Sequence, residues 1–176
     1  ASEATQYDVS GATNYQGGKG DVLADISKAC TEHDMDMGLY LSPWDIHDES
    51  YGYKDASGKA LVEFVDTNND GKPDKNQPVN GLTWEQVKQQ DAKDYNKYYN
   101  DRLIEILGND KYGNKGHFKE VWMDGAKGSG AGYQEYDFKK WFDTIQQYEG
   151  IAGNQVDDCM LFGAEAYTTV RWIGNE

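Results

Sequence analysis

The stretch that most constrains the fold is FKEVWMDGA at 118–126. It is a short apolar run that ends on a carboxylate, Asp124, and Gly125 follows at once with a glycine-rich loop behind it. Such a run predicts a buried strand. Ligands of α/β proteins bind at the carboxyl ends of parallel strands, where a carboxylate is held by a rigid element and still faces a cavity. Asp before Gly also begins ordinary turns, so the dipeptide alone leaves both interpretations open.

The elements predicted along the chain alternate between helices and strands. In order, they are a helix over 22–33, a strand over 37–41, a helix over 84–107, the strand that carries Asp124, a helix over 137–148 and a strand over 159–162. Helices are recognised by apolar residues at helical spacing, and strands by short apolar runs. Asp21 and the capping box of Thr83 and Gln86 mark two helix starts. This alternation implies parallel strands joined by right-handed crossovers.

These elements predict an α/β segment of a (β/α)8 TIM-like barrel, and residues 1–176 are interpreted as part of that catalytic barrel. The chain has 176 residues and shows only three strong strands. A closed barrel has eight strands and usually needs about 250 residues. Residues 48–82 interrupt the alternation as a loop excursion that is rich in glycine and contains two prolines. Within it, Leu61–Val65 is expected to form one strand of a hairpin.

The charge of the chain excludes two classes of partner. The formal net charge is −14, from 31 acidic and 17 basic residues. Nucleic acids and anionic membrane surfaces attract basic patches, so we expect no nucleic-acid partner. No apolar run approaches the length of a membrane span, so we expect no membrane insertion. Cys30 and Cys159 lie in apolar runs and are predicted to be buried free thiols.

Polar and aromatic side chains follow the predicted strand ends. Trp44, Asp45 and His47 follow the first strand, Asp124 ends the second, and Glu165 and Glu176 follow the third. The ends of parallel strands meet at one rim, so these groups are expected to face one cleft. Two carboxylates in one cleft can serve as acid and nucleophile on a glycosidic bond. Acidic residues are abundant in this chain, so their spacing alone does not decide the chemistry.

Four blocks of the sequence resemble, in the right order, successive blocks of the α-L-fucosidases of glycoside hydrolase family 29. The blocks are GLYLSPWD at 38–45, YNKYY at 95–99, VWMDGA at 121–126 and VRWIGNE at 170–176. The first and last most resemble the subfamily that cleaves α-1,3 and α-1,4 fucose from Lewis-type glycans. The resemblance implies a retaining exo-glycosidase that releases L-fucose from a fucosylated oligosaccharide or glycoconjugate, with no cofactor for catalysis.

The resemblance also implies roles for individual residues. Asp124 matches the catalytic nucleophile, and Glu176 matches the general acid/base. Asp124 would attack the anomeric carbon while Glu176 protonates the leaving oxygen, and Glu176 would then activate water. The substrate-binding residues that the matching blocks imply are Trp44, His47, Trp122, Arg171 and Trp172.

Two features depart from the family pattern. The paired histidines of the family, expected upstream, are absent from this segment. Thr169 stands where an acidic residue is frequent, in a loop that is longer than usual, so Glu165 is an alternative acid/base to Glu176. Two other functions stay open: a carbohydrate-binding barrel without catalysis, and a glycosidase for another sugar. Glycan substrates and low cysteine content predict a secreted or cell-surface protein of a bacterium.

A calcium loop is predicted within the excursion, at DTNNDGKPD. Its alternating oxygen side chains, with glycine sixth, follow the calcium-loop pattern. The predicted ligands are the side chains of Asp66, Asn68, Asp70 and Asp74 and the backbone carbonyl of Lys72. Gln77 replaces the usual bidentate Glu, and the flanks are not helices, so any ion would be structural. The alternative is a metal-free turn in which Asn and Asp bond to their own backbone.

Overall fold

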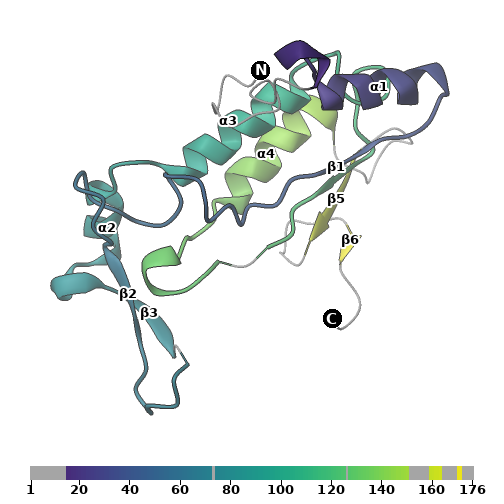
Figure 1. Cartoon of the computed structure of the whole chain (residues 1–176). Helices are drawn as coiled ribbons and strands as arrows, with labels where there is room; N and C mark the ends of the chain where they lie inside the picture. The colour runs from purple at the N-terminus through teal and green to yellow at the C-terminus, as the bar shows by residue number, and fades with distance from the viewer. Residues whose placement is uncertain (1–14, 73, 126, 151–158, 164–169, 172–176) are drawn as a thin grey trace. The chain divides into compact units, whose positions relative to one another are not determined.

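The computed structural model describes residues 15–72, 74–125, 127–150, 159–163, 170 and 171. The helices are η2 (Gln16–Gly18), α1 (Val22–Glu32), η3 (Val79–Gly81), α2 (Trp84–Gln90), α3 (Tyr95–Leu107), η4 (Gly130–Gly132) and α4 (Phe138–Glu149). The strands are β1 (Gly38–Tyr40), β2 (Val62–Val65), β3 (Lys75–Pro78), β4 (Glu120–Trp122), β5 (Met160–Gly163) and β6 (Val170–Arg171) (Figure 1).

The chain divides into two compact units. The first comprises Ala1–Leu41, Tyr99–Asp124 and Phe138–Glu176, and the second comprises Ser42–Tyr98 and Gly125–Asp137. Helix α3 begins in the second unit and continues into the first. The parallel sheet belongs to the first unit, and the excursion predicted at 48–82 lies within the second.

The sheet of the first unit confirms the prediction of parallel strands. Its order is β1-β4-β5-β6, and each neighbouring pair is parallel. Strand β6 pairs Val170 with Phe162 and was not predicted, because two residues are too short to show a pattern. The four strands form an α/β sheet of the kind found in a barrel segment, and the closed barrel stays a prediction.

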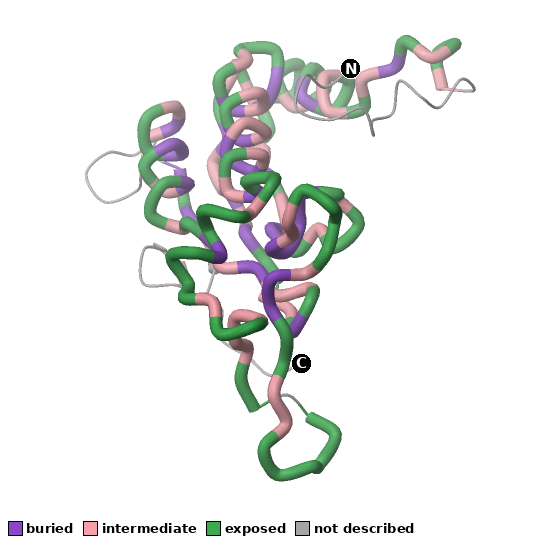
Figure 2. The backbone as a smooth tube through the Cα atoms, turned by 90° about the vertical axis from the view of Figure 1, so that its left-hand side faces the viewer, coloured by how far each residue is buried: buried purple, intermediate pink, exposed green. Residues whose placement is uncertain are grey.

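The two faces of this sheet differ in burial. Leu39, Val121 and Leu161 are register neighbours and are all buried. Successive strand residues point to opposite faces, so Tyr40, Trp122 and Phe162 point the other way. Helices α3 and α4 lie side by side along the strands, and buried positions recur along both helices (Figures 1 and 2). The apolar core of the unit therefore lies between the sheet and these helices.

Helix α3 packs closely on α4. The rings of Tyr99 and Trp141 are 4.1 Å apart, and Thr144 donates a hydrogen bond of 2.7 Å to the side chain of Asn100. Gly108 directly follows α3, and a Cβ there would lie 2.7 Å from the Ile104 carbonyl oxygen of the same helix and 3.1 Å from Tyr148 Cε1 on α4. The C-terminal end of the helix predicted over 84–107 is confirmed, because α3 ends at Leu107.

The second unit contains the predicted hairpin. Strands β2 and β3 pair antiparallel with Val62 opposite Pro78, and residues 67–72 of their connecting loop are exposed (Figure 2). The core of the unit consists of Tyr53, Leu61, Val62 and Val87. The capping box of Thr83 and Gln86 is present at the start of α2, as predicted.

The prediction of one helix over 84–107 is wrong, because α2 ends at Gln90 and α3 begins at Tyr95. Asp91 has an extended backbone and its carboxylate accepts a hydrogen bond from the Lys54 amide, while the Lys54 carbonyl accepts from Ala92. Asp94 accepts from the amide of Lys97 and so caps α3. Contacts with a distant segment and a second cap therefore override the helical periodicity.

Both cysteines are free; Cys159 is buried and Cys30 is half-buried. Among the helices that the structure describes, none combines the length and apolar character that crossing a bilayer requires.

Candidate functional site

Asp124 lies two residues beyond the carboxyl end of β4, within the first unit. The backbone that leads to it is held on both sides. On one side Leu41 donates to the carbonyl of Trp122 over 3.0 Å, and on the other Met123 donates to the carbonyl of Phe162 over 3.2 Å. The carboxylate itself is exposed. This is the place where a parallel α/β sheet presents groups to a ligand.

The side chain of Asp124 has a partner that the sequence did not single out. The Tyr40 hydroxyl donates a hydrogen bond of 2.6 Å to Asp124 Oδ2. Tyr40 is the last residue of β1 and the register neighbour of Trp122 in β4. The signal is that Tyr40 ends its strand and is the register neighbour of Trp122, two residues before Asp124, and it becomes visible only when the two strands are known to be adjacent.

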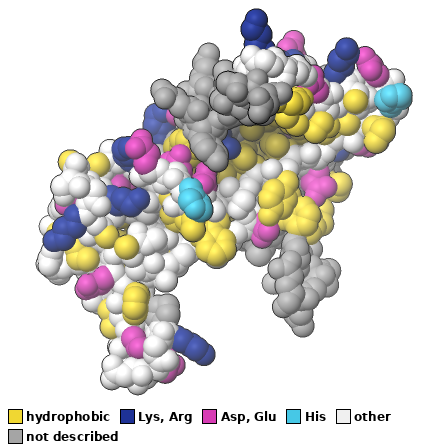
Figure 3. Space-filling view, viewed as in Figure 1, with side chains coloured by type: hydrophobic (Ala, Val, Ile, Leu, Met, Phe, Trp, Pro, Cys, Tyr) yellow, Lys and Arg dark blue, Asp and Glu magenta, His cyan; other side chains and the backbone are white. Residues whose placement is uncertain are grey.

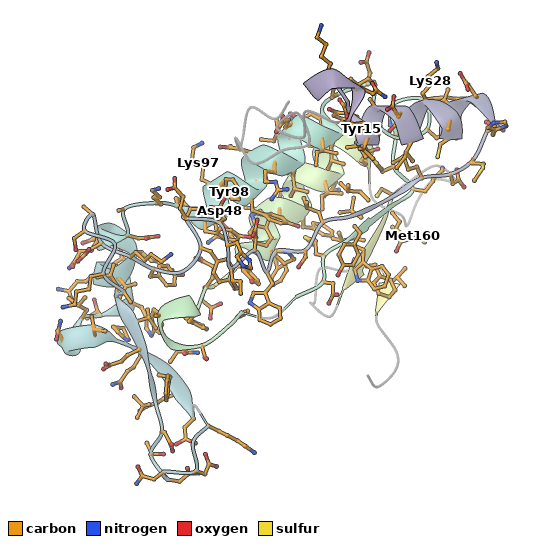
Figure 4. All side chains as sticks on the ribbon, viewed as in Figure 1. Tyr15, Lys28, Asp48, Lys97, Tyr98 and Met160 are labelled. Carbon is orange, nitrogen blue, oxygen red and sulfur yellow. The ribbon has the colours of Figure 1, made fainter. Side chains whose placement is uncertain are left out.

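An aromatic row crosses the sheet beside this carboxylate. The rings of Tyr40 and Trp122 are 5.4 Å apart, edge to face, and those of Trp122 and Phe162 are 4.6 Å apart. Tyr40 keeps 57% of its surface exposed, and Met160 on the same face keeps 41% (Figure 4 labels Met160). Hydrophobic side chains gather over β1 and β5, with acidic groups among them (Figure 3). Aromatic rings beside a carboxylate suit a sugar, which has an apolar face and polar hydroxyls.

Gly125, which follows Asp124 directly, has a backbone conformation that favours glycine. Its φ is +150°, and a Cβ there would lie 2.6 Å from Trp44 Cβ and 3.0 Å from Ser42 Oγ. The same serine oxygen accepts a hydrogen bond of 3.1 Å from the Trp44 amide. The backbone at Asp124 and Gly125 forms no regular turn, so the turn interpretation of Asp-Gly is wrong here; the positive φ and the close approach to Trp44 explain the glycine instead.

The predicted site residues fall into three groups. Asp124 and Trp122 belong to the first unit; Trp44, which is 48% exposed, and His47, which is also exposed, belong to the second. That these residues face one cleft stays a prediction. Arg171 has its backbone in β6, paired with Gly163. The predictions for Glu176, Trp172 and Glu165 lie outside the described residues, and so does that for the Arg171 side chain.

His117 contacts a buried carboxylate. Its Nδ1 lies 3.2 Å from Glu149 Oε2, and the same oxygen accepts a hydrogen bond of 3.2 Å from the Phe118 amide. Burial raises the pKa of Glu149, and the hydrogen bonds from Phe118 and His117 oppose this. The contact fastens the end of α4 to the segment that leads into β4.

The loop of the predicted calcium site bonds to its own backbone. Asp66 accepts from the amides of Asp70 and Gly71, over 3.2 and 2.8 Å, and Asp74 accepts from the amide of Thr67. The hydrogen bonds from Thr67 lower the pKa of Asp74. Among the described residues, no three His, Cys, Asp or Glu side chains are grouped so as to hold a metal ion. Calcium binding stays a prediction.

Comparison with known proteins gives relatives over the whole chain, although no family model matches it. Alpha-L-fucosidase 1 of Arabidopsis thaliana is 34% identical over 175 residues, which are 99% of this chain and 24% of the relative. A putative alpha-L-fucosidase 1 of Oryza sativa subsp. japonica is 29% identical, with the same coverage of each chain.

Solved structures give stronger similarity. A Ruminococcus gnavus GH29 fucosidase in complex with fucose is 60% identical with a TM-score of 0.75, over 100% of this chain and 30% of that one. The crystal structure of SpGH29 is 39% identical with a TM-score of 0.69, over 100% of this chain and 29% of that one.

The class of protein that these relatives indicate is a glycoside hydrolase. More narrowly, the chain is GH29-like: in sequence and in fold it is similar to a segment of α-L-fucosidases. It spans about a quarter of the length of the curated relatives, at 24%.

Proposed function

We propose that the full-length protein carrying this segment is a retaining α-L-fucosidase that releases L-fucose from α-1,3/1,4-fucosylated, Lewis-type glycans. The observation that carries the proposal is a carboxylate, Asp124, just past the end of β4 in a sheet whose whole segment is 60% identical to a fucosidase in complex with fucose. The linkage preference rests on the resemblance of the first and last sequence blocks.

In the proposed mechanism Asp124 attacks the anomeric carbon and Glu176 gives a proton to the leaving oxygen. Glu176 then takes a proton from water, which hydrolyses the glycosyl–aspartate ester and releases fucose. Trp122, next to Tyr40 in the aromatic row, supports a sugar contact at this point of the sheet. The other proposed substrate contacts are Trp44, His47, Arg171 and Trp172.

Release of L-fucose from a Lewis-type trisaccharide, compared with release from a 1,2-linked fucoside, tests the activity and the linkage. We expect the wild type to act on the first, and Asp124→Ala to lose activity by at least about a thousandfold, as for other members of catalytic groups. Asp36→Asn, an exposed carboxylate before β1, is the matched control and should retain activity.

Each alternative function has its own outcome in this assay. Fucose binding without hydrolysis by the wild type would indicate a carbohydrate-binding barrel. Release of a different sugar, lost in Asp124→Ala, would indicate another specificity. Proton NMR of the first product formed decides the stereochemistry: an α anomer indicates retention, and a β anomer would overturn the retaining mechanism.

The acid/base assignment is tested by Glu176→Gln beside Glu165→Gln. Loss of the acid should slow hydrolysis of a glycan far more than that of an aryl fucoside, whose leaving group needs little protonation. We expect this pattern for Glu176→Gln alone. The same pattern in Glu165→Gln alone would transfer the role, and full activity of both variants on the glycan would refute a carboxylic acid/base at either position.

We further propose that the loop 66–74 binds a structural calcium ion, with the side chains of Asp66, Asn68, Asp70 and Asp74 and the carbonyl of Lys72 as ligands. Support comes from the sequence pattern and from the loop's place between the paired strands β2 and β3. Calcium should raise Tm relative to chelator, and an Asp66→Ala variant should not respond. Metal analysis that finds no calcium after purification in calcium-containing buffer would count against the site.

A secreted or cell-surface location in a bacterium is part of the same proposal. It rests on the extracellular setting of branched glycans, while the curated relatives come from plants and similar solved structures come from bacteria. Fractionation of the source cells, followed by fucosidase assay, tests the location.

A further inference from the structure

We infer that Tyr40 is the positioning residue for Asp124: its hydroxyl holds one carboxylate oxygen so that the nucleophile meets the anomeric carbon in the right orientation. This inference rests on the proposed function. The Tyr40 hydroxyl donates to Asp124 Oδ2 over 2.6 Å. That distance lies in the range of hydrogen bonds from a hydroxyl to an ionised oxygen, which are stronger than neutral ones.

The tyrosine ring is itself held by a rigid element. Tyr40 is the last residue of β1, paired with Trp122, and the two rings meet edge to face at 5.4 Å. The next residue, Leu41, donates from its amide to the Trp122 carbonyl and accepts from the Tyr99 hydroxyl at its own carbonyl. A functional group on an element fixed in this way is placed more reliably than one on a loop.

Asp124, by contrast, needs such a support. It lies past the last residue of β4, and Gly125 behind it has a φ of +150°. The strand ladder fixes the backbone up to Met123, through its bond to the Phe162 carbonyl. The torsions of the carboxylate beyond that point are set by side-chain contacts, and the Tyr40 hydroxyl supplies one. A displacement of about 1 Å at a reacting atom can cost about a hundredfold in rate.

The test compares Tyr40→Phe with Tyr15→Phe in the full-length protein. Tyr15 also donates to a carboxylate, at 2.7 Å from Asp25 Oδ2, so both variants lose one phenol–carboxylate bond (Figure 4 labels Tyr15). Tyr40→Phe keeps the ring that packs on Trp122, so Tm should stay near that of the wild type. We expect kcat on the fucosylated glycan to fall by about 10- to 100-fold with KM within about threefold, and Tyr15→Phe to match the wild type.

A binding measurement separates positioning from direct sugar contact. In the Asp124→Ala background, adding Tyr40→Phe should leave the Kd for free fucose unchanged, because the partner through which Tyr40 acts is gone. A weakening of tenfold or more there would mean that Tyr40 binds the sugar itself and would overturn the inference.

The activity arms also separate the two proposals. A wild type that releases fucose, with Tyr40→Phe equal to it in kcat, would overturn the positioning role and leave the proposed function intact. Absence of fucose release from the wild type would overturn both.

Discussion

The hydroxyl of Tyr99 on α3 donates a hydrogen bond of 2.6 Å to the backbone carbonyl of Leu41, the residue that follows β1. Tyr99 is fully buried and its ring lies 4.1 Å from that of Trp141 on α4. One side chain thus joins both helices to the end of the strand that presents Tyr40. This contact therefore links helices α3 and α4 to the strand end at which the candidate site lies.

We predict that Tyr99→Phe lowers the free energy of unfolding by about 1–3 kcal/mol, because the Leu41 carbonyl loses a buried donor. The ring and its contact with Trp141 remain, so no large cavity term is added. Denaturant unfolding measures the change. Tyr15→Phe, which removes an exposed hydrogen bond, should stay within about 0.5 kcal/mol of the wild type. Equal stability of all three proteins would contradict a structural role for this bond.

Gly125→Ala should impair the site more than it impairs the fold. An alanine Cβ would lie 2.6 Å from Trp44 Cβ at a φ of +150°, so the backbone after Asp124 must shift. Backbone strain of this kind costs about 1–3 kcal/mol, and we expect fucosidase activity to fall by at least about tenfold, as for other small misplacements.

Gly132→Ala is the control for this glycine. It lies in the same glycine-rich loop, and a Cβ there would meet no atom within 4 Å. Its activity and Tm should match those of the wild type. If Gly125→Ala also matched the wild type in both, the close approach to Trp44 would not constrain the backbone at this position.

The first unit could be predicted well from sequence because its signals are local. Asp21 caps α1 as its position before the apolar stripe indicates, and its side chain accepts from the Ala24 amide. Short apolar runs likewise located β1, β4 and β5, and their alternation with helices gave the parallel pairing. Strand β6 has two residues, which is below the length at which any periodicity can be detected.

What the sequence could not give were contacts between distant residues. In the sequence, Tyr40 is one of several residues in a short apolar run. Only its register with Trp122 places it beside Asp124. The break between α2 and α3 likewise depends on the exchange of hydrogen bonds between Lys54 and residues 91 and 92. The roles of Asp124 and Trp122 came from resemblance, because carboxylates and tryptophans at strand ends have no unique chemistry of their own.

Cys159 should resist alkylation in the folded protein. Burial, followed by the negative charges of Glu149 and Glu120, raises the pKa of the Cys159 thiol to about 12, and only the thiolate reacts quickly. Mass spectrometry after iodoacetamide at pH 8 should find Cys159 unmodified in the native protein and fully modified in denaturant. Cys30 is half-buried and should react earlier. Modification of Cys159 at the rate seen in denaturant would show that its environment opens in solution.

The carboxylate of Asp91 should make the second unit lose stability as pH rises through about 6. Burial raises the pKa of Asp91 from 3.8 to about 6, with a smaller contribution from Asp94, against the hydrogen bonds from the Lys54 and Lys93 amides. Because the folded pKa exceeds the unfolded one, the favourable contribution is complete below pH 3.8 and disappears as pH rises through about 6. Asp91→Asn cannot ionise and should lack this loss.

Between pH 4 and 8, the free energy of unfolding of Asp91→Asn should therefore increase relative to that of the wild type as pH rises. Asp36→Asn, at an exposed position, should show no such trend. Carbon NMR of the Asp91 carboxyl group gives a direct value, with an expected midpoint near 6. A midpoint near 3.8, or parallel pH profiles for the wild type and Asp91→Asn, would mean that the junction between α2 and α3 is more hydrated than its hydrogen bonds to Lys54 indicate.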